Sequence, residues 1–123
     1  MFDHLALGVS DLAASKAFYL QALAPLGITA VMEFPETAGL GIAPKPSFWL
    51  ALAKQTPAAP HIAFSAQTRV QVDAFHRAAL AAGGQDNGAP ELRPHYHTNY
   101  YGAFVIGPDG HNVEAVCHEP EGK

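Results

Sequence analysis

His4-Leu5-Ala6-Leu7 recurs later in the chain as His61-Ile62-Ala63-Phe64, and this repetition decides the fold. The shift that superimposes the two stretches also superimposes Phe18 on Phe75, Leu23 on Leu80 and Gly27 on Gly84. Matches that keep one register over such a distance indicate an internal repeat, and a repeat sets the architecture of a domain. We therefore expect two equivalent halves packed around a pseudo-twofold axis, which would bring His4 and His61 together.

Each half is predicted to contain one strand, one helix and three further strands. Large and small residues alternate from His4 to Val9, as in a strand with one buried face, and apolar residues then follow at helical spacing up to Gly27. Ser10 or Asp11 is the expected N-cap of the first helix, and Thr68 is that of the second. The remaining strands are expected near residues 29–34, 39–43 and 48–53, and near 90–93, 101–106 and 112–117.

This order predicts an α+β domain built from two βαβββ modules. Each helix can cover one face of a sheet, so the curved mixed sheets should enclose a central cavity and carry the helices on their outer face. A length of 123 residues corresponds to a single domain. Module 1 is expected to span about residues 1–56 and module 2 about residues 57–123, because Pro57 and Pro60 mark the junction.

Composition and charge exclude several classes of protein. Charged residues make up 15% of the chain and apolar residues 49%, which is typical of a globular protein. The net charge of −4 argues against nucleic acid as a partner, because phosphate binding needs a basic face. No apolar run approaches the roughly 18 residues of a membrane span. The lone Cys117 and the lack of a visible signal peptide lead us to expect a cytoplasmic protein.

His4, His61 and Glu114 form the first candidate site. The two histidines occupy equivalent positions of the repeat, and Glu114 lies within the apolar run of the last predicted strand. A carboxylate in such a strand is costly unless it is paired or bound to a metal. Two imidazoles and one carboxylate suit a divalent metal that keeps open positions for substrate or water. A purely structural role for each histidine is the alternative.

The segment from Arg93 to Tyr101 is the second candidate site. It gathers titratable, aromatic and amide groups just before a core strand, where loops often carry binding residues. Histidine titrates near neutral pH and can transfer a proton. The alternative is a solvated loop whose aromatic rings pack on the sheet edge. The candidates for catalysis are His95, His97 and Tyr101, and those for substrate binding are Trp49, Arg93, Asn99 and Tyr100.

The other histidines rank lower. We expect His76, on the second helix, and His111, after a turn, to be exposed to solvent. His118 is expected at the surface, with an approach to the metal site as the alternative. Cys117 should behave as a small buried apolar residue.

Three segments together resemble one family over essentially the whole chain. They are Asp3-His4-Leu5-Ala6-Leu7-Gly8-Val9, Pro60-His61-Ile62-Ala63-Phe64 and Gly107-Pro108-Asp109-Gly110-His111-Asn112-Val113-Glu114. The family is the vicinal oxygen chelate superfamily, which is the glyoxalase, bleomycin-resistance and extradiol-dioxygenase fold. Its metal ligands come from the first and last strands of each half. The resemblance therefore implies His4, His61 and Glu114 as ligands.

The chain departs from the family pattern at one ligand position. Glyoxalase I-type enzymes place an acidic residue in the last strand of the first half, where this chain has Phe48-Trp49-Leu50-Ala51-Leu52. The remaining ligands are similar to the set of two histidines and one carboxylate in extradiol dioxygenases and in metal-dependent thiol transferases acting on fosfomycin. Fe, Mn, Zn and Ni are all compatible with such a set.

The resemblance implies a divalent-metal-dependent enzyme acting on a small oxygen-bearing substrate, by lyase, isomerase or dioxygenase chemistry. A metal-free small-molecule or antibiotic-binding protein of the bleomycin-resistance type is the alternative. A regulatory module that keeps the ligands without turnover is a third possibility. A small-molecule substrate and a second copy of the chain, in a homodimer, are the expected partners, with no nucleic acid and no membrane.

Overall fold

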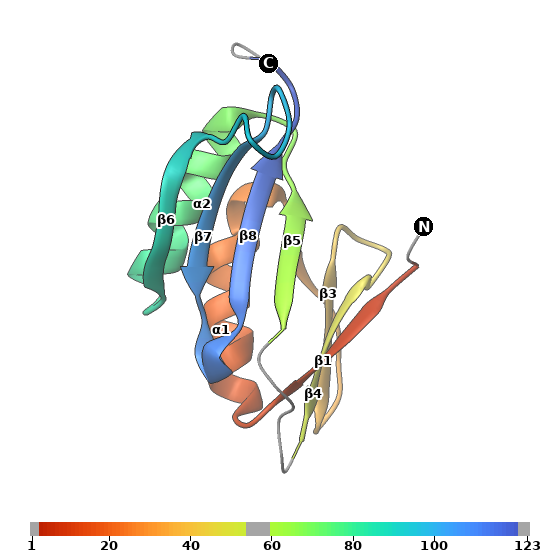
Figure 1. Ribbon diagram of the computed structural model, residues 1–123. Coiled ribbons are helices and arrows are strands. Elements are labelled where there is room, and N and C mark those ends of the chain that lie inside the picture. The colour runs from red at the N-terminus through yellow and green to blue at the C-terminus, as the bar shows by residue number, and fades with distance from the viewer. Residues whose placement is uncertain (1–2, 54–59, 121–123) are drawn as a thin grey trace.

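The computed structural model describes residues 3–53 and 60–120, and it shows two helices and two sheets (Figure 1). The predicted junction between the modules, near residue 56, lies outside the described residues. Neither α-helix in the described part of the chain is long and apolar enough to cross a membrane.

Module 1 forms one four-stranded sheet with one α-helix. Its elements are β1 (Leu5–Val9), α1 (Leu12–Leu23), a 3₁₀ turn (Ala24–Leu26), β2 (Thr29–Glu33), β3 (Thr37–Gly41) and β4 (Phe48–Leu52). The strand order is β1-β4-β3-β2, and β1 is parallel to β4 while the other neighbours are antiparallel. The predicted mixed sheet is confirmed for this half.

Module 2 repeats the same order. Its elements are β5 (His61–Ser65), α2 (Arg69–Ala81), β6 (Gln85–Leu92), β7 (Tyr101–Ile106), a 3₁₀ turn (Pro108–Gly110) and β8 (Asn112–Cys117). The strand order β5-β8-β7-β6 matches that of module 1 element by element. The two βαβββ modules are therefore confirmed.

Strand β6 is longer than predicted. It begins at Gln85, whereas the sequence indicated a strand only near residues 90–93. Its first three residues are polar and exposed, and its pairing with β7 shifts register on both sides of Gly88. An edge strand with bulges lacks a clean alternation of apolar and polar residues, so its first half carries no strand pattern.

Polar N-caps begin both helices, as predicted. The Asp11 carboxylate accepts a hydrogen bond from the Ala14 amide at 3.0 Å, and the Thr68 hydroxyl accepts one from the Gln71 amide at 3.1 Å. α1 ends at Leu23, before the predicted stop. A 3₁₀ turn follows, and Gly27 closes it with a φ of 82°, a left-handed conformation that glycine adopts without strain.

The core joins the two modules through aromatic rings. Tyr19 of α1 meets Phe48 of β4 edge-on, and Phe48 meets Phe64 of β5 edge-on, each with ring centroids 5.1 Å apart. Both helices lie on one face of the β5–β8 sheet (Figure 1). The opposite face of this sheet is left free of helices, and the candidate site lies there.

Two histidines that were expected in solvent are buried. His111 is 1% exposed, and its Nδ1 is hydrogen-bonded to the Tyr19 hydroxyl at 2.8 Å. The turn before it is held against module 1, because Asp109 accepts hydrogen bonds from the Ser10 amide and hydroxyl. His76 is also buried, with its Nε2 bonded to Asp86 on β6 at 2.9 Å. These predictions were wrong because packing between elements covers both rings.

Candidate functional site

Glu114 is the centre of the candidate site. It lies in the middle of β8 and is 1% exposed, so its carboxylate has lost almost all of its water. The His61 Nε2 donates to Oε1 at 2.8 Å, and the Tyr100 hydroxyl donates to Oε2. Both oxygens therefore have a protein partner, as a buried carboxylate requires.

Sheet register explains why these side chains meet. β5 runs parallel to β8 with Ala63 opposite Glu114, so His61, two residues earlier, points to the same face. β7 places Phe104 opposite Glu114, and the Phe104 and His61 rings lie 5.8 Å apart. The site is thus built on three neighbouring strands, on the face without helices.

His4 lies at the rim of the site. Its Nδ1 is bonded to Asp3 at 2.9 Å, and its side chain is more than half exposed. His4 and His61 both line one cavity of about 430 Å³, together with Leu5, Ser47 and Ile62. Within residues 3–53 and 60–120, no three His, Cys, Asp or Glu side chains are close enough together to hold a metal ion. The structure therefore joins His61 to Glu114 and leaves His4 apart from them.

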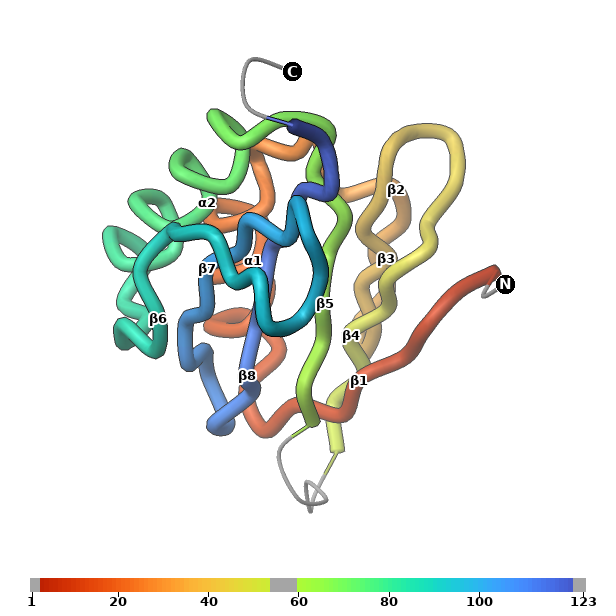
Figure 2. The backbone as a smooth tube through the Cα atoms, turned by 45° about the horizontal axis from the view of Figure 1, so that its top comes forward, coloured from red at the N-terminus to blue at the C-terminus, as the bar shows by residue number. Residues whose placement is uncertain are grey.

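The segment before β7 covers the carboxylate. Figure 2 shows this stretch, between β6 and β7, crossing in front of β8. Arg93 stacks over the Phe104 ring at 4.8 Å, and its amide donates to the Tyr100 carbonyl at 2.7 Å. The segment is thus anchored at its base and carries the Tyr100 hydroxyl onto Glu114.

The two histidines of this segment, His95 and His97, pack on other exposed aromatic rings. His97 packs edge-on against His118 with centroids 5.5 Å apart, and His118 packs edge-on against Tyr100 at 5.3 Å. His95 packs on Tyr96 at 4.2 Å. His118 packs directly on Tyr100, whereas His97 and His95 reach Tyr100 only through another ring, that of His118 and that of Tyr96 respectively.

Three other candidates remain, and two of them, Tyr101 and Trp49, lie elsewhere. The Tyr101 hydroxyl donates to Asp73 of α2 at 2.6 Å, because alternation along β7 turns this side chain to the helix-covered face. Trp49 of β4 stacks with Phe34 at 6.4 Å on the sheet of module 1. Asn99 is half-buried beside Tyr100 in the chain. The structure does not bring Tyr101 or Trp49 to the Glu114 carboxylate.

The hydroxyl of Tyr100 stays protonated near neutral pH. Burial raises its pKa above the usual range, and the neighbouring Glu114 carboxylate raises it further. Tyr100 is therefore a hydrogen-bond donor at this site, not an anion.

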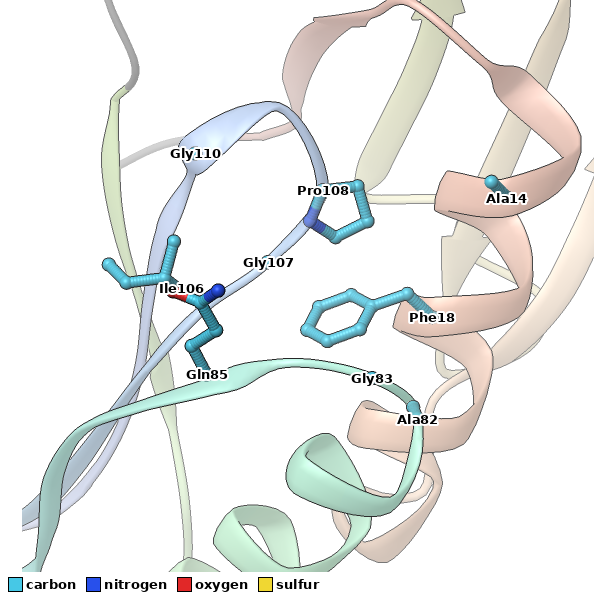
Figure 3. A pocket seen from close by; sticks show the side chains of 9 residues that line it. All are labelled: Ala14, Phe18, Ala82, Gly83, Gln85, Ile106, Gly107, Pro108 and Gly110. Atoms are coloured by element: carbon cyan, nitrogen blue, oxygen red, sulfur yellow. The ribbon is translucent and has the colours of Figure 1, made fainter.

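Two further cavities differ from the site in character. One, of about 380 Å³, is lined by apolar side chains, including Leu40, Phe48 and Phe64, and shares Leu5 and Ile62 with the histidine-lined cavity. The other, of about 450 Å³, lies between the start of α1 and the turn after β7 (Figure 3). None of the predicted site residues lines that third cavity.

The sequence analysis did not identify Phe104 as a residue of the site. The signal for it was present, because the predicted hairpin around Asp109-Gly110 pairs Phe104 with Glu114. Counting outward from the turn would have placed an aromatic ring beside the candidate carboxylate. The hydrogen bond between Tyr100 and Glu114 had no such signal, because a loop conformation makes it.

The chain belongs to the Glyoxalase/Bleomycin resistance protein/Dioxygenase superfamily, whose family model matches residues 1–115. A solved glyoxalase/bleomycin resistance protein from Albidiferax ferrireducens T118 is 32% identical, with a TM-score of 0.81 over 98% of this chain and 99% of that chain. The family predicted from the sequence motifs is thus confirmed.

More distant solved structures share the fold alone. A glyoxalase/bleomycin resistance protein/dioxygenase family enzyme from Burkholderia phytofirmans PsJN is 20% identical, with a TM-score of 0.74 over 95% of this chain and 98% of that chain. A glyoxalase-related enzyme from Fulvimarina pelagi is 23% identical, with a TM-score of 0.73 over 92% and 84%. No curated protein matches the chain.

Proposed function

We propose that the protein is a divalent-metal-dependent enzyme that acts on a small oxygen-bearing substrate, by lyase, isomerase or dioxygenase chemistry. The observation that carries this proposal is the pairing of His61 Nε2 with the buried Glu114 Oε1 at 2.8 Å, beside the cavity that His4 also lines.

The donor set fits a divalent metal. An imidazole nitrogen and a carboxylate oxygen are ligands of first-row metals, and here one of each already lie in contact. His61 and Glu114 would hold the ion, and His4, which lines the same cavity as His61, is the third proposed ligand. A bound divalent ion acts as a Lewis acid on a substrate oxygen.

The surrounding residues have distinct tasks. Glu114 supplies the negative charge, and its burial in β8 keeps that charge away from water. Phe104, stacked under Arg93 and beside His61, gives the site an apolar wall. The exposed side of His61 opens on the cavity through which a substrate would enter.

Replacing Glu114 by Gln tests the proposal. The side chain keeps nearly the same shape, so the fold should persist, but the only anionic ligand of the proposed set is lost. We expect the affinity for Zn²⁺ or Mn²⁺ to fall by about tenfold or more, measured by calorimetric titration of protein freed of metal. Elemental analysis of protein purified without chelator should find one metal ion per chain in the wild type.

Glu33→Gln is the matched control. Glu33 is an exposed carboxylate of β2 that pairs with Lys16 at 2.5 Å, in the other module. Metal affinity should be unchanged in this variant. If the wild type binds no divalent metal, or if Glu114→Gln binds as tightly as the wild type, the metal-dependent function is wrong.

A metal-free small-molecule-binding protein is the second candidate. The observation that favours it is the apolar cavity of about 380 Å³, since apolar walls with few polar groups are typical of ligand pockets. Binding of an apolar fluorescent dye that is equal in the wild type and in Glu114→Gln, together with no metal uptake, would favour this candidate.

A further inference from the structure

The second oxygen of Glu114 has a partner that the proposed metal site does not explain. Oε1 faces His61, while Oε2 accepts a hydrogen bond from the Tyr100 hydroxyl. A carboxylate with two free oxygens can present either one, or both, to a ligand site. Here both oxygens have protein partners, and only the partner of Oε1, His61, belongs to the proposed ligand set.

Tyr100 is itself held from two sides. Its ring meets Tyr96 edge-on at 5.1 Å and His118 edge-on at 5.3 Å. The segment is closed by backbone hydrogen bonds from the Tyr100 amide to the His97 carbonyl at 3.1 Å and from the Arg93 amide to the Tyr100 carbonyl. The hydroxyl is therefore delivered to Glu114 by a structured segment.

The sheet leaves room for this contact at Gly102. A Cβ atom there would lie 3.1 Å from the Tyr100 ring and 3.3 Å from Glu114 Oε2, which is tighter than ordinary side-chain contacts. Glycine at this position of β7 thus lets both groups sit against the strand. The ring contacts, the backbone hydrogen bonds and this glycine all favour the same placement of the hydroxyl.

We propose that Tyr100 is a positioning residue, which holds Glu114 Oε2 so that only Oε1 faces His61, the residue that lines the cavity. This inference rests on the proposed metal-dependent function for its consequence, which is that Glu114 serves as a ligand through a single oxygen. Tyr100 contacts Glu114 and does not line the cavity that His4 and His61 share. It acts through the orientation of the carboxylate, as partners of metal-binding carboxylates commonly do.

Tyr100→Phe, with Tyr96→Phe as the matched control, tests the proposal in protein without metal. Tyr100→Phe removes the hydroxyl that bonds to Glu114 and keeps the ring. Tyr96→Phe removes a different hydroxyl and keeps the ring that packs on Tyr100. The imidazole ¹⁵N–¹H resonance of His61 reports its hydrogen bond to Glu114. We expect this resonance to shift in Tyr100→Phe and to stay in place in Tyr96→Phe. An unshifted His61 resonance in Tyr100→Phe would overturn the proposal.

Addition of Co²⁺ tests the consequence for the metal ligand. With Oε2 free, Glu114 can bind through both oxygens, so the visible absorption band of Tyr100→Phe should lose intensity as the coordination number rises. The Co²⁺ affinity should fall by about tenfold, and Tyr96→Phe should match the wild type in both measurements. A wild-type band in Tyr100→Phe would overturn the single-oxygen assignment.

The two experiments separate the two proposals. If the wild type takes up no Co²⁺ while the His61 resonance shifts in Tyr100→Phe, the metal-dependent function fails and the positioning of Glu114 by Tyr100 stands. Thermal unfolding of both variants within a few degrees of the wild type shows that neither result comes from a damaged fold.

Discussion

At the scale of single residues, Glu114 and His111 are both buried titratable groups on or beside β8, and their surroundings differ. Glu114 receives two hydrogen bonds from donors. His111 is bonded to one neutral hydroxyl, that of Tyr19, which keeps its own proton because burial raises the pKa of that hydroxyl. The environment of His111 favours a neutral imidazole.

His111 should make the stability of the fold depend on pH. Burial lowers its pKa below the usual value, and the Asp109 carboxylate only partly offsets this shift. The unfolded chain therefore binds a proton, at a pKa of about 6.5, before the folded chain does. Folding stability should be unaffected by His111 above about pH 7 and should fall as the pH drops below that unfolded value.

Urea unfolding at about pH 7.5 and about pH 5.5 measures this effect. The free energy of unfolding should decrease toward the lower pH in the wild type, and His111→Gln should lose part of that decrease. His95→Gln, which changes an exposed histidine, is the control and should keep the wild-type dependence. Equal pH dependence in His111→Gln and the wild type would refute this role.

At the scale of elements, β4 lacks the acidic residue that the resemblance to glyoxalase I-type enzymes would place there. Its residues, from Phe48 to Leu52, carry no carboxylate, and Trp49 stacks with Phe34 on its partly exposed side. β8, by contrast, keeps its carboxylate and pairs it with β5. The two modules therefore have the same strands, but of their last strands only that of module 2 carries a carboxylate.

We expect weak or no isomerisation of the hemithioacetal of methylglyoxal and glutathione by the purified protein. A metal bound by His4, His61 and Glu114 would have one anionic ligand fewer than in glyoxalase I-type enzymes, and the substrate would have one candidate base fewer. Absorbance assay of the thioester product, with the protein loaded in turn with Ni²⁺, Zn²⁺ and Mn²⁺, measures this. Robust turnover would show that the departure in β4 does not matter.

At the scale of the whole molecule, the two sheets remain separate. β1 is an edge strand of one sheet and β5 is an edge strand of the other. We call the region between these two edge strands the seam. The apolar cavity lies at this seam, and Leu5 and Ile42 on its walls are 43% and 66% exposed. Exposed strand edges and apolar patches are commonly covered by another chain.

We predict that the protein is a homodimer in solution and that this seam contributes to the contact. Light scattering after size-exclusion chromatography should give twice the mass of one chain. Ile42→Asp places a charge on an exposed position of the seam, so it should shift the protein toward the monomer, while Val70→Asp on α2, at a position 72% exposed, should not. A monomeric wild type at concentrations of about 0.1 mM would contradict this prediction.

From the sequence alone, the two modules, most of their elements and the family could be predicted. The repeat of His4 at His61 predicted two equivalent modules, the alternation of large and small residues predicted the strands, and Asp11 and Thr68 marked the helix starts. The signals for the strands and the helix starts are local, because side-chain period and capping depend on residues within a few positions of each other. Glu114 also stood out locally, as a charge inside an apolar strand.

Only the tertiary structure decided which side chains meet. It buried His111 against Tyr19, turned Tyr101 toward α2, left His4 with Asp3 and brought Tyr100 onto Glu114. Apart from the contact between His4 and Asp3, each of these contacts joins two different elements, or joins a loop to a strand. Local periodicity does not encode such contacts, because they depend on how elements pack and how a loop closes over the sheet.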